Sequence, residues 1–182
     1  MESDERCGMS FTNYDVLMRH ARHSCAMKNT QNYYTDKYTL FVENYIVSST
    51  VVMRRSIFLD ALNYLKNTEF RMGDYPIWLY FSMVSRISFV SGCTTVYRVI
   101  GGSSSHRGYL SQIRMFESEY DVKQFFMARF SVPDDVVKEA EIRFSRKMLR
   151  PAFLAGDKQK IQSCCDILDR LGYKPAFIEK LY

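Results

Sequence analysis

One aspartate of this chain stands where a carboxylate can act on a bound molecule. Asp74 lies in the segment GDYP, between a polar loop and an apolar stretch that predicts a helix over 77–84. It can cap this helix by accepting from the first backbone N–H groups, a role that Pro76 early in the helix favours. It can also be a general base, if the proton it removes comes within hydrogen-bond distance. The local sequence leaves both roles open, and a capped carboxylate is also an oriented one.

A second group of residues has the spacing of metal ligands. His20, His23 and Cys25 could bind zinc through imidazole nitrogens and a thiolate. No second ligand cluster follows them, and the neighbouring Arg19 and Arg22 oppose a cation. Short isolated ligand clusters are weak signals, so a solvated loop is the favoured interpretation.

The composition is that of an ordinary folded chain. Its 182 residues are 47% hydrophobic and 15% aromatic, enough to bury a core and to exclude disorder. The net charge of +5 fits a membrane surface or an anionic ligand, and equally a protein that binds neither. No apolar run has the length of a membrane span, and acidic residues rather than a signal sequence follow Met1. The five cysteines do not form a disulfide framework, so we expect a cytoplasmic location.

The elements that must position Asp74 are short strands and helices. A strand is expected over 8–14, and the polar stretch 15–36 is expected to form a hairpin and an exposed loop. A β-branched run over 46–52 leads into a helix, and two further strands follow the helix that Asp74 precedes. The predicted helices are 39–44, 56–66 and 77–84, and the predicted late strands are 87–90 and 94–97.

From residue 109 onward the pattern is helical. Apolar residues recur at helical spacing around Ile113 and again around Phe144. Asp157 is a candidate N-cap for a third helix, with Gly172 as its stop. We expect Pro151 to kink or end the second helix, and a last short helix to begin near residue 175. The tail is therefore predicted to be a helical appendage of three or four segments.

The second tail helix is rich in basic residues. With apolar side chains on another face, it could lie on a membrane surface or bind a partner. A solvated basic face with its apolar side packed on the domain is the favoured alternative. The basic residues are Lys138, Arg143, Arg146, Lys147 and Arg150.

Three segments, in this order, resemble the C-terminal half of a family 2 glycosyltransferase. They are SSTVVMRR, FRMGDYPIWL and VYRVIGGSSSH. The opening CGMSFTNYD is also similar to the strand that follows the donor-binding half in that family. The resemblance covers about 7–106 and does not reach the helical tail.

The resemblance implies an α/β fold of the GT-A type, a Rossmann-like sandwich that uses a nucleotide-sugar donor and Mg²⁺ or Mn²⁺. It also implies inverting transfer to a sugar or lipid-linked acceptor, in which a carboxylate deprotonates the acceptor hydroxyl for in-line attack on the anomeric carbon. Matched residue by residue, the base falls on Asp74, with Gly73 where many members have another acid. Trp78 matches a tryptophan on the acceptor side, where packing under the site is its expected role.

On the donor side, the resemblance points to the end of the last strand and the loop after it. Arg98 matches an arginine that could face the diphosphate, as guanidinium groups suit phosphate, or could pair with a core carboxylate. Ser105 and His106 end a Gly/Ser loop that folds over the donor in the family. His106 would meet the metal or the diphosphate, and is otherwise a surface histidine. The acceptor-side hydroxyls would be those of Ser48, Ser49 and Thr50, which could instead satisfy strand backbone.

The resemblance also says what to expect of the chain as a whole. We find no Asp-x-Asp motif after a donor-side strand and no preceding βαβ units. We therefore expect an α+β half-domain over 1–107 and the helical tail over 108–182. This chain would supply the acceptor side and the general base, and would be inactive alone. A half-sheet exposes an edge, so a homodimer through that edge is expected.

The main alternative is a non-catalytic interaction module derived from such a half-domain. A nucleic-acid binder is the less favoured rival, because the aromatic residues lie mostly at core spacing and no motif interleaves them with basic ones. The expected location is the cytoplasm, and peripheral attachment of the protein to the inner face of the membrane is compatible with it.

Overall fold

The computed structural model describes residues 4–18, 21–25, 36–99 and 108–173 of the chain. The chain divides into two compact units, Met1–Gly101 and Gly102–Tyr182. The N-terminal unit mixes strands and helices, and the C-terminal unit is helical where it is described. The predicted mixed α/β class is thus confirmed. The boundary predicted after residue 107 falls outside the described residues.

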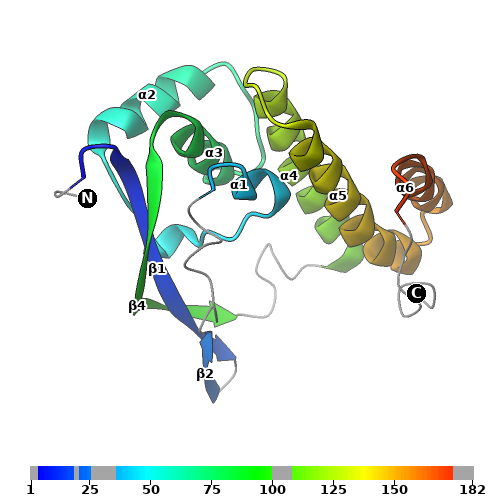
Figure 1. Ribbon diagram of the computed structural model, residues 1–182. Coiled ribbons are helices and arrows are strands. Elements are labelled where there is room, and N and C mark those ends of the chain that lie inside the picture. Colours follow the sequence, from blue (N-terminus) through cyan, green and yellow to red (C-terminus); the bar gives the residue numbers. More distant parts are fainter. Residues whose placement is uncertain (1–3, 19–20, 26–35, 100–107, 174–182) are drawn as a thin grey trace. The chain divides into compact units, whose positions relative to one another are not determined.

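The sheet of the N-terminal unit is built around β1, Cys7–Met18 (Figure 1). Along one edge β4, Arg86–Val99, runs parallel to β1 over almost its whole length. Along the other edge β3, Val52–Met53, and β2, Ala21–Cys25, pair antiparallel with β1. Within the described residues this makes a mixed sheet of four strands. β4 has β1 as its only partner there, so pairing of two copies through its other edge stays a prediction.

β4 is one strand, so the prediction of two strands over 87–90 and 94–97 was wrong. The pairing of β1 with β4 is irregular around Asn13, where the register shifts twice. The Asn13 Nδ2 amide donates to the carbonyl of Ser91 at 3.1 Å, which bridges the irregular step. Small residues there predict a turn locally, but pairing with β1 carries the chain through as a strand.

Three short helices and a 3-10 turn complete this unit. They are α1, Thr39–Val42; α2, Arg55–Leu65; α3, Tyr75–Val84; and the 3-10 turn η1, Ser48–Thr50. The β-branched run over 46–52 therefore yields η1 and the start of the two-residue β3. α3 is apolar on several faces, and it ends where Ser85 turns extended and donates its hydroxyl to the Phe81 carbonyl at 2.9 Å.

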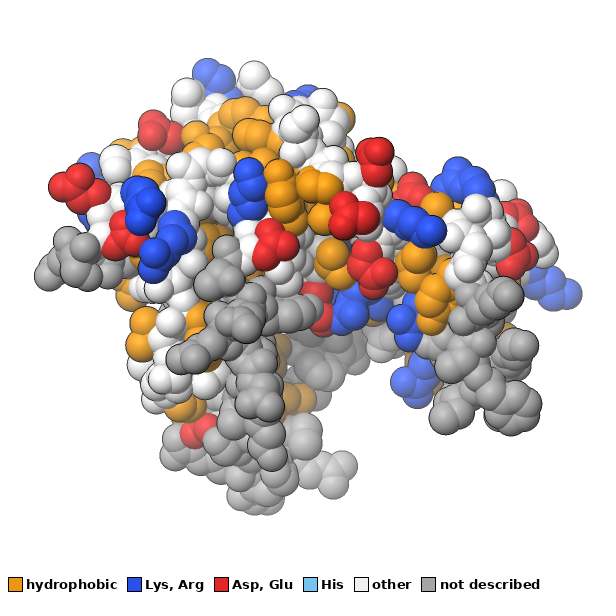
Figure 2. Space-filling view, in the orientation of Figure 1, with side chains coloured by type: hydrophobic (Ala, Val, Ile, Leu, Met, Phe, Trp, Pro, Cys, Tyr) orange, Lys and Arg blue, Asp and Glu red, His pale blue; other side chains and the backbone are white. Residues whose placement is uncertain are grey.

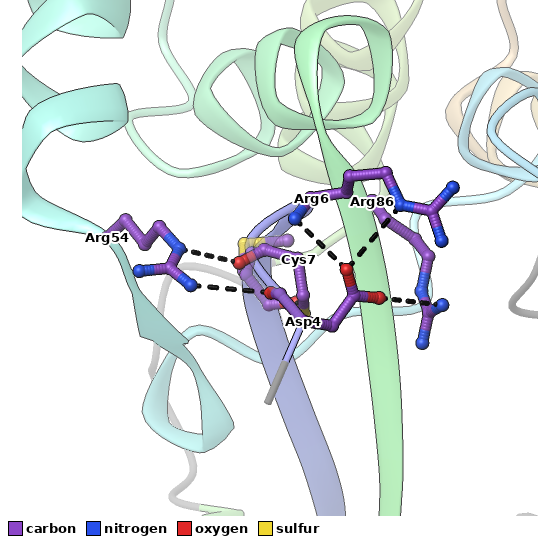
Figure 3. A network of polar contacts seen from close by, with 6 residues as sticks. Asp4, Arg6, Cys7, Arg54 and Arg86 are labelled. Atoms are coloured by element: carbon purple, nitrogen blue, oxygen red, sulfur yellow. Dashed lines mark hydrogen bonds and ion pairs between the residues drawn. The ribbon is translucent and has the colours of Figure 1, made fainter. Parts of the chain in front are cut away.

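The beginning of β1 is tied to its neighbours by arginines (Figure 3). The Arg54 guanidinium donates to the carbonyl of Cys7 at 2.9 Å and to that of Asp4 at 3.3 Å. The Arg86 guanidinium forms an ion pair with the Asp4 carboxylate at 2.9 Å. The starts of β1, β4 and α2 are thereby joined through backbone and side chain together.

The core of the N-terminal unit lies between the sheet and its helices. β1 contributes Met9 and Phe11, which are almost fully buried. The other largest buried side chains of this unit are Leu40, Phe41, Tyr75, Leu79 and Phe81.

The C-terminal unit contains α4, Gly108–Met127; α5, Asp134–Ala155; and α6, Lys158–Arg170. Ile113, Met148 and Cys164, one from each helix, form its buried core. Ile113 clusters with Met148, and seven residues later the Tyr120 ring stacks on Phe144 with centroids 4.2 Å apart, so α4 and α5 run antiparallel.

The ends of these helices carry the predicted caps, with one exception. Asp157 accepts from the Lys160 N–H at 2.9 Å, and Gly172 after α6 has a φ of 67°, as a helix stop requires. α5 continues through Pro151 to Ala155 and ends at Gly156, whose φ is 72°. Pro151 therefore does not end α5, and a kink there, the other expected outcome, stays a prediction. A proline removes one helical hydrogen bond. Here the Pro151 side chain is buried, and the long helix continues in spite of the missing bond.

None of the helices in the described parts of the chain has both the length and the apolarity needed to cross a lipid bilayer.

Candidate functional site

Asp74 forms the N-terminal boundary of α3. Its Oδ1 accepts from the Tyr75 N–H at 2.8 Å, and its carbonyl accepts from the N–H groups of Ile77 and Trp78 at 3.0 and 3.1 Å. The side chain is half-buried, and Oδ2 makes no hydrogen bond within the described part of the chain. The carboxylate therefore caps the helix with one oxygen and leaves the other available to accept a proton.

α3 holds this carboxylate on a rigid support. The Tyr75 side chain is fully buried, and its hydroxyl donates to the Leu40 carbonyl at 2.6 Å. One turn further on, Trp78 is only 3% exposed. Its Nε1 has no hydrogen-bond partner among the described residues. Trp78 therefore packs beneath the helix, as expected, rather than displaying its ring at the surface.

The three acceptor-side hydroxyls differ in their surroundings. Ser48 and Ser49 are exposed, whereas Thr50 is buried and its hydroxyl donates to the Val47 carbonyl at 2.7 Å. The Thr50 hydroxyl thus hydrogen-bonds to the backbone, which is the second of the two roles considered for it. The Ser49 carbonyl accepts from the Thr95 hydroxyl at 3.0 Å, which fixes η1 against β4. Only the Ser48 and Ser49 hydroxyls remain open to a ligand.

Arg98 lies near the end of β4, opposite Leu17 of β1. Its side chain is exposed and forms no ion pair with a carboxylate of the described residues. α3 and β4 are consecutive, but Asp74 begins the first and Arg98 nearly ends the second. No contact in the described chain brings the two side chains together.

Several predicted site residues cannot be placed. Ser105, His106 and His20 lie outside the described residues, and so do the contacts of His23 and Cys25. Among the residues that are described, no group of three or more His, Cys, Asp or Glu side chains could hold a metal ion.

A hollow lies at the opposite end of α3 from Asp74. Its volume is about 770 Å³, within the range of small-molecule sites. α3 spans about 15 Å, so the hollow and Asp74 are separate features. No pattern in the sequence indicates this hollow, because its walls come from segments that are brought together only in the fold. Its lining includes Arg6, Asp36, Lys37, Tyr38, Leu40, Tyr45, Ser82, Met83, Val84, Ser85, Arg86 and Ile87.

Two cations of this hollow are held by one carboxylate. The Arg6 guanidinium Nε lies 3.6 Å from Asp4 Oδ1, which also accepts from the Arg6 backbone N–H at 3.0 Å, and the Arg86 guanidinium lies 2.9 Å from Asp4 Oδ2 (Figure 3). The backbone hydrogen bond from Arg6, helped by the Arg86 and Arg6 charges and opposed by desolvation, lowers the pKa of Asp4 below its ordinary value of 3.8. The Asp4 carboxylate offsets much of the positive charge here, so the hollow has no strong preference for anions.

Comparisons of the chain with protein-family models, with curated proteins and with solved structures find no match.

Proposed function

We propose that this chain carries the acceptor side of an inverting glycosyltransferase similar to family 2, with Asp74 as its general base. One observation carries the proposal. Asp74 is half-buried, its Oδ1 is fixed by the Tyr75 N–H at 2.8 Å, and its Oδ2 makes no hydrogen bond in the described chain. A base oriented by one oxygen and open at the other fits proton abstraction from a hydroxyl.

In the proposed step the acceptor hydroxyl gives its proton to Asp74. The acceptor oxygen forms a bond to the anomeric carbon of the donor sugar as the bond from that carbon to the diphosphate breaks. The diphosphate leaves with the electron pair, and the configuration inverts. Asp74 must hold the hydroxyl at hydrogen-bond distance, and the anchoring of α3 through Tyr75 keeps it in place.

The remaining residues have supporting roles in this proposal. Ser48 and Ser49 are exposed and could bind acceptor hydroxyls, whereas Trp78 supports α3 from below. Arg98, Ser105 and His106 would contact the donor diphosphate. The described residues do not form a site for Mg²⁺ or Mn²⁺, so no step of the proposal passes through a metal ion.

The parallel pair of β1 and β4, with α3 leading directly into β4, supports the finer expectation of a partial GT-A sheet. The proposal includes inactivity of the chain alone, because the chain has no Asp-x-Asp motif to hold the donor diphosphate through a metal ion. It also includes a cytoplasmic location.

The test replaces Asp74 in native cells, where any chain that completes the enzyme is present. The gene is deleted and restored as the parent, as Asp74→Asn or as Asp60→Asn, and transfer from labelled UDP- and GDP-sugars is measured in extracts. Asp74→Asn keeps the oxygen that caps α3 and removes the base, so we expect transfer to fall by about 10²- to 10⁴-fold. Asp60→Asn makes the same chemical change at an exposed site on α2 and should keep the parent rate.

Two outcomes would contradict the proposal in different ways. Transfer by Asp74→Asn at the parent rate would show that Asp74 is not the base. Extracts of the deletion strain that transfer every sugar as well as the parent would exclude a glycosyltransferase. The non-catalytic interaction module would then take its place.

A further inference from the structure

The second half of α5 is basic and carries no acid. The residues from 142 to 155 include Arg143, Arg146, Lys147 and Arg150 and not one Asp or Glu. The acids of α5 lie in its first half, with Asp134 and Asp135 in the first turn. Cations near a helix C-terminus are favoured by the helix dipole, so charge alone does not call for a ligand.

Exposed apolar side chains accompany this charge. Phe153 is 61% exposed and Leu154 is 43% exposed, both in the last turn of α5. Leu110 in the first turn of α4 is 61% exposed. The helix dipole gives no reason for large apolar residues in water, and soluble surfaces seldom gather them.

The antiparallel packing of α4 and α5 brings these residues to one end of the C-terminal unit. Because Ile113 packs in the same core as Met148, the first turn of α4 lies level with the last turn of α5. Arg114 is on α4, one turn after Leu110. We call the set Leu110, Arg114, Arg150, Phe153 and Leu154 the basic end of the unit.

The basic end differs from the other charged parts of the C-terminal unit. Lys123 and Lys147 are paired with Glu119, and Lys160 is paired with Glu117. Arg114 and Arg150 are exposed and form no ion pair among the described residues. Figure 2 shows Lys and Arg side chains beside hydrophobic ones over the helices of this unit.

We propose that the basic end docks on a membrane surface that contains anionic phospholipids. Arginine side chains pair with lipid phosphates, and Phe153, Leu154 and Leu110 enter the boundary between headgroups and acyl chains. Neither element suffices alone, since charge is screened by salt and a few apolar side chains bind weakly. Guanidinium groups without ion pairs among the described residues and exposed apolar side chains lie at the same end of the unit. This combination is complementary to an anionic bilayer surface. The proposal does not depend on glycosyl transfer.

The test is sedimentation of the full chain with vesicles. One set is phosphatidylcholine alone, and the other has phosphatidylglycerol as a quarter of its lipid. We expect binding to the anionic vesicles only. We also expect it to weaken when salt rises from about 0.1 M to about 1 M, which shortens the Debye length from about 10 Å to about 3 Å.

Single variants locate the surface. Arg114→Gln and Arg150→Gln should each lower the partition coefficient about fivefold, the effect of one basic residue near an anionic surface. Phe153→Ser should lower it about tenfold, because an apolar side chain no longer leaves water. Lys138→Gln is the matched control. It removes the same charge from an exposed site on the acidic first half of α5 and should bind as the parent does.

Three results would overturn the proposal. They are equal binding to both vesicle sets, no binding to either set, and a loss in Lys138→Gln as large as that in Arg150→Gln. Light scattering on the parent and on Phe153→Ser adds a fourth. A dimer that Phe153→Ser dissociates would mean that a second copy, and not lipid, covers this end.

Discussion

Polar contacts stabilise each of the two units internally, and the buried ones differ in their range along the sequence. In the N-terminal unit, the bond from Arg54 to the Cys7 carbonyl joins residues 47 positions apart, and the bond from Tyr75 to Leu40 joins residues 35 apart. In the C-terminal unit, the most buried ion pair joins Glu119 and Lys123, four residues apart on one helix. The site residues thus depend on buried bonds to distant segments. In the helical unit the buried pair is local, and the pairs between helices, such as Lys160–Glu117 and Arg170–Glu141, are partly exposed.

This difference can be measured because each unit has its own signal. Trp78, the single tryptophan of the chain, lies in the N-terminal unit, so its fluorescence reports the unfolding of that unit. The three long helices of the C-terminal unit supply most of the helical circular dichroism. A substitution that acts within one unit should move that unit's transition more than the other.

Glu119→Gln should produce the largest loss of stability. The Glu119 carboxylate lies 2.8 Å from the Lys123 ammonium, which is almost fully buried, and 3.5 Å from that of Lys147. Removing the negative charge leaves Lys123 buried beside another cation, which should cost about 3 kcal/mol. Urea unfolding followed by circular dichroism measures this cost. Glu119→Gln combined with Lys123→Met removes both charges and should regain most of it.

The pH dependence provides a control for the same pair. Desolvation raises the pKa of Glu119, but Lys123 and Lys147 outweigh it and hold the pKa below its ordinary value of 4.5. A carboxyl with a lowered folded-state pKa stabilises fully above its unfolded pKa and loses that contribution as the pH falls through the folded one. The parent should therefore lose stability below about pH 4.5, and Glu119→Gln should lose less. Equal losses would show that the Glu119 carboxylate does not supply this pH-dependent stability.

Gly8→Ala should destabilise the N-terminal unit by about 2 kcal/mol. A Cβ at Gly8 would lie 2.7 Å from the Ser85 Cβ and 2.8 Å from the Ile57 Cδ1, so β1 would have to move away from α2 and the end of α3. Urea unfolding followed by Trp78 fluorescence should show the shift. Gly73→Ala is the control, because a Cβ there meets nothing within 4 Å. An equal effect of the two substitutions would contradict the close approach.

The sequence predicted most of the helical unit for a physical reason. Helical periodicity and end caps are local, and Asp157, Gly156 and Gly172 act within a few residues of their own positions. Pro151 does not end α5, because the local rule on proline does not weigh the packing of a long helix. In the N-terminal unit, the sequence located Asp74 and α3. It did not reveal that β4 is continuous or that Arg54 ties down β1, because both depend on pairing with distant segments.

The candidate site divides in the same way. The helix boundary at Asp74 was visible in GDYP, since loop-to-helix junctions have local signals. The sequence did not reveal that the Leu40 carbonyl anchors this helix, nor that a hollow lies at the other end of the helix. No spacing in the sequence encodes either feature.

A matched pair of tyrosines gives the smallest and most direct test of the comparison. The Tyr75 hydroxyl donates to the Leu40 carbonyl at 2.6 Å in the core, whereas the Tyr120 hydroxyl lies 3.4 Å from a Glu141 oxygen in a half-buried position. Burial, with the Glu141 charge, raises the pKa of Tyr120 to about 12, so this hydroxyl stays protonated at neutral pH. Tyr75→Phe leaves a buried carbonyl without its donor and should cost about 1.5 kcal/mol.

Tyr120→Phe loses only a long contact and should cost under about 0.5 kcal/mol. Trp78 fluorescence and circular dichroism measure the two costs, each in its own unit. Because Tyr75 follows Asp74 directly, Tyr75→Phe should also slow transfer in the cell-extract assay, where Tyr120→Phe should not. If the two variants lose the same free energy of unfolding, the bond from Tyr75 to Leu40 stabilises its unit no more than the long Tyr120 contact stabilises the other unit. The anchoring of Asp74 through Leu40 would then have to be abandoned.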